Sequence, residues 1–149
     1  MNRWMQCSGV LTILSLMACG GDRQGAVPAD TDSDYQTTLM TQLIDAKPGD
    51  VIEIPAGKFA FERSLSLTVD NVTVRGQGMD KTVLSFAGQT SGAEGILVTA
   101  NDFTIEDLAI EDTRGDALKI NEGNNIIIRR VRTEWTNGPD TDNGAYGIY

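Results

Sequence analysis

The sequence predicts an all-β solenoid, in which short strands recur at a fixed period and stack on one another. The clearest repeat lies between Gly95 and Thr133, where two similar segments follow each other. Each segment contains three short runs in which apolar residues alternate, and alternation is the period of a β-strand. Phe103 and Ile126 are equivalent, which gives a period of 23 residues. Because no single run is long enough to be stable alone, the repeat indicates stacked coils.

A third copy of the repeat lies upstream, and a fourth begins at Gly147. Residues 65–76 match residues 96–107 position for position, so that Val72 is equivalent to Phe103, 31 residues later. The additional residues fall in the glycine-rich stretch 77–94, where we expect a longer loop. Tyr149 falls inside a strand, and a last coil without a neighbour exposes an unpaired edge. The sequence therefore predicts the N-terminal part of a longer protein, with the solenoid incomplete at its C-terminus.

Residues 1–18 have the pattern of a signal peptide, with Arg3 followed by an apolar run that is too short to span a bilayer. The run ends in Leu16-Met17-Ala18-Cys19, which resembles the bacterial lipobox. This resemblance implies cleavage before Cys19 and lipidation of its sulfur, so that acyl chains would anchor the protein to a membrane. Gly20 after the cysteine implies the outer membrane of a Gram-negative bacterium. The alternative is an ordinary secretory signal with an incidental cysteine.

Residues 19–34 are expected to form a flexible tether, because they are rich in Gly, Asp, Ala and Pro and hold few large apolar residues. Tyr35–Ala46 is predicted to be a helix, with an apolar stripe at Leu39, Met40, Leu43 and Ile44. Solenoids need a cap over the apolar end of their first coil, and we assign this helix to that role. Residues 35–149 then form the solenoid domain.

The expected strands follow in order, separated by Pro-Gly and Gly-x-Gly turn signals. Upstream of the clearest repeat they are Val51–Ile54, Leu65–Val69, Val72–Val74 and Val83–Phe86. Within it they are Ile96–Val98, Phe103–Ile105, Leu108–Ile110, Leu118–Ile120, Ile126–Ile128 and Val131–Thr133.

Composition limits the possible functions. The 149 residues include 12 Lys and Arg and 21 Asp and Glu, so the net charge is −9. An acidic chain disfavours nucleic acid as a partner through its overall field. The sequence contains no histidine, which removes the commonest general base and the commonest zinc or copper ligand. We expect one domain and a monomer.

The repeat resembles that of the right-handed parallel β-helix in the pectin-lyase-like superfamily. Residues 46–59, in which two proline-glycine turns flank a strand, are similar to the first coil of that superfamily. The resemblance covers residues 45–149 and implies coils of three strands, each strand lying on its equivalent in the next coil. It leaves the function open, because the fold hosts lyases, hydrolases, epimerases and non-enzymes.

The register makes a prediction about charge. Arg75, Glu106 and Arg129 occupy equivalent positions in three successive coils, about 4.8 Å apart. We therefore expect a column of alternating charge on the surface, with a substrate-binding arginine as the alternative role. The next column is Gly76, Asp107 and Arg130. Members of the superfamily often carry a ladder of asparagines at this turn, and the present chain departs from that pattern.

The first strands place Leu97, Lys119 and Tyr149 at one outward-facing position, and in the superfamily this face commonly forms the substrate groove. Lys119 and Tyr149 are therefore candidate catalytic residues, or contacts to a uronate and to a sugar ring. Glu94 and Asp116 precede equivalent strands and are candidates for acid–base work or for holding calcium against an acidic polymer. The alternatives are ordinary exposed side chains and carboxylates that cap turns.

Four residues complete the set of candidates. Arg114 is a third candidate catalytic residue, for a lyase that needs a base and a cation beside a carboxylate. Asp140 and Asp142 alternate in a glycine-containing segment that resembles a calcium loop but lacks its downstream Glu, so a plain turn-rich loop is the favoured interpretation. Trp135 is either a platform for a sugar or a lid packed on the solenoid. No other cofactor is expected.

Three functions remain open at this stage. The first is a lipid-anchored lyase or epimerase that acts on acidic polysaccharide in the cell envelope. The second is a non-catalytic solenoid that binds glycan or has a structural role. The third is a periplasmic metal-delivery protein, against which the lack of histidine argues.

Overall fold

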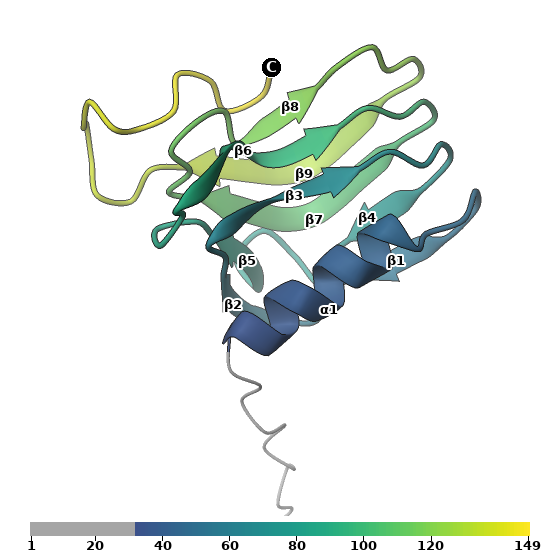
Figure 1. Ribbon diagram of the computed structural model, residues 1–149, viewed down its shortest axis with the longest axis horizontal. Coiled ribbons are helices and arrows are strands. Elements are labelled where there is room, and N and C mark those ends of the chain that lie inside the picture. The colour runs from purple at the N-terminus through teal and green to yellow at the C-terminus, as the bar shows by residue number, and fades with distance from the viewer. Residues whose placement is uncertain (1–31) are drawn as a thin grey trace, which may run out of the picture.

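A computed structural model of the protein describes residues 32–149, which form a parallel β-solenoid of about three turns preceded by one helix (Figure 1). The predicted all-β fold with a short N-terminal helix is confirmed. The predictions for the signal peptide, for Cys19 and for most of the tether lie outside the described residues.

Helix α1 spans Asp32–Ile44, so it begins inside the stretch that was predicted to be a tether and ends before Ala46. Acidic residues such as Asp34 are favoured in a first turn by the helix dipole, which explains the earlier start. Leu39 and Leu43 are buried in the core, as predicted. Ile44 is 68% exposed, so its place in the apolar stripe was wrong.

The helix covers the N-terminal end of the solenoid, where it contacts β2 (Gly57–Ala60) and β3 (Arg63–Leu67) (Figure 1). The Oε1 atom of Gln36 accepts hydrogen bonds from the backbone N–H groups of Glu62 at 2.7 Å and Arg63 at 3.2 Å. Tyr35 stacks on Phe59 with ring centroids 4.0 Å apart, and its burial raises the pKa of its hydroxyl to about 12. The predicted capping role of the helix therefore has a physical basis.

Three stacks of parallel strands follow. The first contains β3, β6 (Ser91–Val98) and β8 (Leu118–Ile120). The second contains β1 (Val51–Glu53), β4 (Thr73–Arg75) and the first halves of β7 (Thr104–Glu111) and β9 (Ile127–Glu134). The third contains β2, β5 (Thr82–Ser85) and the second halves of β7 and β9. The long strands β7 and β9 turn the corner at Asp107 and Arg130, whose φ angles are 60° and 52°.

Strand β2 was not predicted. Its sequence, Gly-Lys-Phe-Ala, contains one large apolar residue, so it lacks the alternation that marks the other strands. It pairs along its whole length with β5, and Phe59 packs against Tyr35. Tertiary pairing therefore makes a strand where the local pattern gives no signal.

The predicted register is confirmed in the first and second stacks. Leu65 lies opposite Ile96, and Ile96 lies opposite Leu118. The N–H of Thr104 donates to the carbonyl of Val72 at 3.0 Å, and the N–H of Ile127 donates to the carbonyl of Phe103 at 2.9 Å. Val72, Phe103 and Ile126 therefore lie above one another, although loops of different length separate them.

The core lies between the three stacks. Phe61 and Phe86 stack on each other at 5.2 Å, and Ile105, Leu108 and Ile110 of β7 are fully buried. The equivalent apolar side chains of β9 are only partly buried. Burial therefore falls towards the last described coil.

A polar ladder connects the coils at the turn before the second stack. Asp70 accepts a hydrogen bond from the N–H of Asn101 at 2.7 Å, and the side chain of Asn101 accepts one from the N–H of Asn124 at 3.0 Å. The superfamily that the repeat resembles carries an asparagine ladder at the turn equivalent to Asp107, and the present chain has its ladder at a different turn. At the observed turn each residue of the ladder is followed by a residue with positive φ, a conformation that Asn and Asp tolerate; these are Asn71, Asp102 and Asn125.

Candidate functional site

The predicted outward column of the first stack is confirmed. Leu97 lies opposite Lys119. The backbone N–H of Tyr149 donates to the carbonyl of Leu118, and the carbonyl of Tyr149 accepts from the N–H of Ile120, at 2.9 Å each, so Tyr149 lies opposite Lys119 in the next coil. The Nζ atom of Lys119 lies 5.4 Å from the ring centroid of Tyr149. This distance fits a cation–π contact between the two candidate residues.

Glu94 and Asp116 join the same group of side chains. The Lys119 ammonium lies 3.4 Å from Oε1 of Glu94 and 4.0 Å from Oδ2 of Asp116. The structure therefore brings together four of the predicted site residues. With Tyr146 we refer to them as the outer-face cluster, whose two carboxylates and one ammonium leave one negative charge.

Tyr146 was not singled out from the sequence. Its ring centroid lies 5.3 Å from that of Tyr149, with the two rings tilted, and the residues are 54% and 61% exposed. Its backbone carbonyl accepts a hydrogen bond from the N–H of Ala117 at 3.0 Å, which places Tyr146 at the start of the next coil. The sequence could have indicated Tyr146, because two tyrosines close together, before and after Gly147, stand out in a chain with only 6% aromatic residues.

A polar cleft of about 380 Å³ lies where the turns that follow the third stack meet in successive coils. Its walls come from the β5–β6 turn, the β7–β8 turn and the loop that follows β9. Figure 1 shows this loop projecting from the stacked strands. The lining residues are Ala87, Gln89, Asp112, Thr113, Arg114, Thr136, Asn137, Asp142 and Asn143. We refer to this feature as the turn cleft.

Buried hydrogen bonds hold the turns of this cleft together. Gln89 is only 4% exposed; its Nε2 donates to the carbonyl of Glu94 at 2.8 Å, and its Oε1 accepts from the N–H of Arg114 at 3.1 Å. The indole N–H of Trp135 donates to the carbonyl of Thr113 at 2.6 Å. Of the two roles considered for Trp135, this contact favours packing on the solenoid.

The remaining candidates lie at the turn cleft rather than in the outer-face cluster. Arg114 and Asp142 both line the cleft. Asp140 accepts a hydrogen bond from the N–H of Asp142 at 3.0 Å, which is the geometry of an Asx turn. Within residues 32–149, no three Asp, Glu, Cys or His side chains gather in a way that fits a metal ion.

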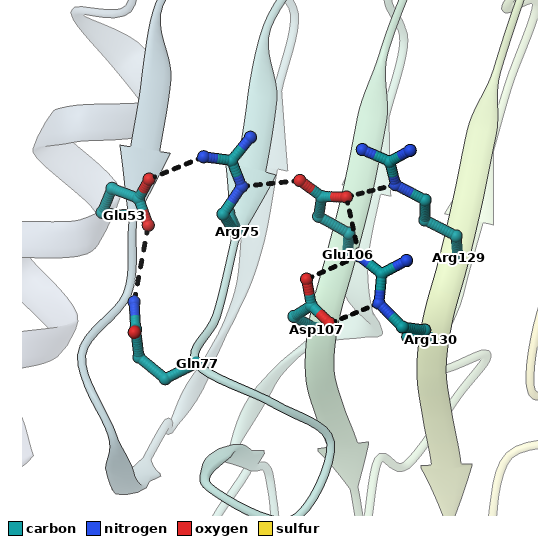
Figure 2. Close-up of polar contacts among 7 residues, drawn as sticks. All are labelled: Glu53, Arg75, Gln77, Glu106, Asp107, Arg129 and Arg130. Atoms are coloured by element: carbon teal, nitrogen blue, oxygen red, sulfur yellow. Dashed lines mark hydrogen bonds and ion pairs between the residues drawn. The ribbon is translucent and has the colours of Figure 1, made fainter.

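The predicted charge column is present and extends one coil further (Figure 2). Arg75 pairs with Glu53 at 2.9 Å and with Glu106 at 2.6 Å, and Arg129 pairs with the other oxygen of Glu106. The column was expected on the surface, but the side chain of Glu106 is only 2% exposed. Hydrogen bonds from Arg129 and then from Arg75 lower the pKa of this carboxyl below its ordinary value of 4.5.

The neighbouring column joins Asp107 to Arg130 by two hydrogen bonds of 2.6 and 2.7 Å (Figure 2). This bidentate contact lowers the pKa of the Asp107 carboxyl and raises that of the Arg130 guanidinium. The position that carries an asparagine ladder in the resembling superfamily therefore carries an ion pair here. Both residues serve the stacking of β9 on β7.

A second charge column, on the third stack, was not predicted. Glu111 is buried and lies 2.8 Å from Nζ of Lys58 and 2.9 Å from Nη2 of Arg132. Glu134 also pairs with Arg132. Lys58 was not predicted to take part because strand β2, which carries it, was not predicted.

Within residues 32–149, no helix has the length and apolar character needed to cross a membrane. Comparison with family models, with curated proteins and with solved structures returned no significant match. Resemblance to the pectin-lyase-like superfamily therefore remains a prediction from the repeat, while the parallel solenoid is observed.

Proposed function

We propose that this solenoid binds a neutral glycan on its outer-face cluster without cleaving it. The observation that carries the proposal is the exposed pair Tyr146 and Tyr149, which lies beside polar side chains on the outer face of the first stack. Aromatic faces offer apolar area to the C–H face of a sugar, while neighbouring polar groups bond to its hydroxyls. An extended stack of parallel strands also suits an extended polymer.

The charges of the cluster favour a neutral glycan over an acidic one. Lys119 already has Glu94 and Asp116 as partners, so a uronate carboxylate would compete with both. The cluster carries a net negative charge, as does the whole chain, at −9. Repulsion at this face therefore disfavours a polyanion.

Retention on polysaccharides tests this proposal. The protein is mixed with insoluble neutral polymers such as cellulose, chitin and xylan, and the bound fraction is measured against protein concentration. We expect saturable binding to at least one polymer, weakened about tenfold or more by Tyr149→Ala, because a few aromatic residues carry most of the binding energy of an interface. Tyr146→Ala should have a similar effect.

Met79→Ala is the matched control, since Met79 is also exposed but lies on the β4–β5 turn. Its binding should equal that of the unaltered protein. Absence of binding to every polymer, or equal losses in Met79→Ala and Tyr149→Ala, would rule out the outer-face cluster as a glycan site.

Lyase or epimerase action on acidic polysaccharide is the second candidate. One observation favours it: the guanidinium of Arg114 lines the turn cleft without an ion-pair partner among residues 32–149. A lyase needs such a cation to stabilise the charge that develops beside a uronate carboxylate. Release of unsaturated uronates from pectate or alginate, followed by ultraviolet absorbance, would support this candidate and contradict purely neutral binding.

We also propose that the domain works at the cell envelope, on a lipid attached to Cys19. Support comes from the sequence around this residue, where a small residue and a short apolar run precede the cysteine. A glycan-binding solenoid on a flexible tether could reach polymers near the membrane surface.

A further inference from the structure

The turn cleft holds two opposite charges that do not neutralise each other. The guanidinium of Arg114 makes one long contact, from Nη1 to the carbonyl of Gln89 at 3.5 Å. The carboxylate of Asp142 has no hydrogen-bond or ion-pair partner among residues 32–149. Elsewhere in the solenoid, neighbouring opposite charges pair directly, as Glu106 does with three arginines.

Hydrogen bonds fix the turns that carry the two charged residues, while the side chains of Arg114 and Asp142 are themselves exposed at the cleft. Gln89 fixes the N–H of Arg114, and the carboxylate of Asp112 accepts from the N–H of Thr136 at 2.6 Å and from its hydroxyl at 2.9 Å. The Nδ2 of Asn143 donates to the carbonyl of Gly138 at 2.8 Å, which closes the loop that carries Asp142. A site that is fixed before binding loses less entropy when a ligand enters.

We propose that the turn cleft binds a small zwitterion, namely a free α-amino acid. The ligand carboxylate bonds to the guanidinium of Arg114, whose planar fork fits a carboxylate in bidentate fashion. The ligand ammonium bonds to the carboxylate of Asp142. A neutral sugar would leave both protein charges unpaired, and a simple anion would leave Asp142 unpaired.

The cleft also limits the size and polarity of the ligand side chain. A volume of about 380 Å³ lies at the lower end of the usual range for small-molecule sites. Ala87 is the one apolar residue among those that line the cleft, so the structure provides no pocket for a large apolar side chain. Small or polar amino acids therefore fit best.

Calorimetric titration with matched probes tests the proposal. The purified protein is titrated with glycine, with both enantiomers of alanine, serine and glutamate, and with propionate and ethylamine, which carry one charge each. We expect at least one amino acid to bind about tenfold tighter than either singly charged probe, because only the amino acid pairs with both protein charges. Arg114→Gln and Asp142→Asn should each weaken that binding about tenfold or more.

Lys47→Gln is the control, because it removes an exposed positive charge from the turn before β1, away from the cleft. It should leave amino-acid binding unchanged, and circular dichroism should show that every variant is folded. Equal affinity for propionate and the amino acids, or no saturable binding of any amino acid, would overturn the proposal. Because Tyr149→Ala should not affect this titration, the result is independent of glycan binding at the outer-face cluster.

Discussion

Glu106 shows how this protein keeps a carboxylate charged while hiding it from solvent. Its side chain is buried, yet one oxygen accepts a hydrogen bond from Arg75 and the other accepts from both Arg129 and Arg130 (Figure 2). Desolvation alone would favour the neutral acid, but the guanidinium groups of Arg129 and Arg75 outweigh it and lower the pKa. The same residue connects β4, β7 and β9, so its charge supports three coils at once.

Replacing Glu106 by Gln should destabilise the fold, because a neutral amide then faces three guanidinium groups and turns an N–H donor towards at least one of them. We expect the free energy of unfolding to fall by about 2 kcal/mol, as measured by urea denaturation. Glu53→Gln, at the exposed end of the column, should cost less than about 1 kcal/mol. Equal costs for the two variants would show that burial of Glu106 is not important.

Stability should fall in acid for the same reason. The folded-state pKa values of Glu106 and Asp107 are lowered from 4.5 and 3.8, because arginines bond to both carboxylates. Their contribution to the free energy of unfolding is therefore complete at pH values above the unfolded-state pKa values, and it is lost as the pH falls through the lowered folded-state pKa values. Urea denaturation between about pH 5 and about pH 3 should show a smaller loss for Glu106→Gln than for the unaltered protein. Parallel losses would contradict this assignment.

At the scale of helices and strands, the sequence predicted an element wherever apolar residues alternate or recur on one face. Phe103 and Ile126 set the register of the second stack because a shift by one residue would turn every core side chain outward. Strand β2 was missed because a single phenylalanine creates no pattern. The ladder of Asp70, Asn101 and Asn124 was also missed, although its spacing equals that of the strands, because its first member is an aspartate and the residues do not form a uniform asparagine column.

Helix α1 contributes to stability through one face only. Leu39→Ala should lower the free energy of unfolding by about 3 kcal/mol, since Leu39 is 1% exposed and the change leaves a cavity between the helix and the first coil. Ile44→Ala, on the same helix, should change it by less than about 0.5 kcal/mol because its side chain lies in solvent. Thermal denaturation of the two variants compares them directly, and similar melting temperatures would contradict the proposed cap.

Strands β7 and β9 should differ in their tolerance of charge. Ile105→Asp places an unpaired carboxylate in a fully buried position and should prevent folding, visible as loss of the β-sheet circular dichroism signal. Ile128 lies opposite Ile105 but is only partly buried, so Ile128→Asp should fold with a lowered melting temperature. Unfolding of both variants would show that the lower burial of Ile128 does not make its position more tolerant of charge.

For the molecule as a whole, candidate residues on the repeated strands were placed correctly from the sequence, whereas the site formed by the irregular turns was not. Lys119 and Tyr149 were placed correctly because strand register fixes outward columns. The turn cleft was not foreseen, since it is formed by turns of unequal length in which no residue matches its equivalent. Arg114 and Asp142 were named from the sequence, but only the fold brings them to one cleft.

Anchoring can be tested on the complete chain in a Gram-negative host. If Cys19 carries lipid, the unaltered protein should sediment with membranes and gain the mass of acyl chains by mass spectrometry. Cys19→Ser should move the protein to the soluble periplasmic fraction. Cys7→Ser is the control, because Cys7 lies in the predicted signal peptide and its loss should change neither result. Membrane retention of Cys19→Ser would contradict lipid anchoring.

The unequal loops between otherwise equivalent strands have a consequence for engineering. Strands keep their partners whether 23 or 31 residues separate one coil from the next. The length of a connecting segment therefore does not set the register of the strands that it joins. A change in the loop after β9 should keep the coils in register as long as it keeps the contacts of Trp135 and Gly144 with Thr113, which tie this loop to the preceding turn.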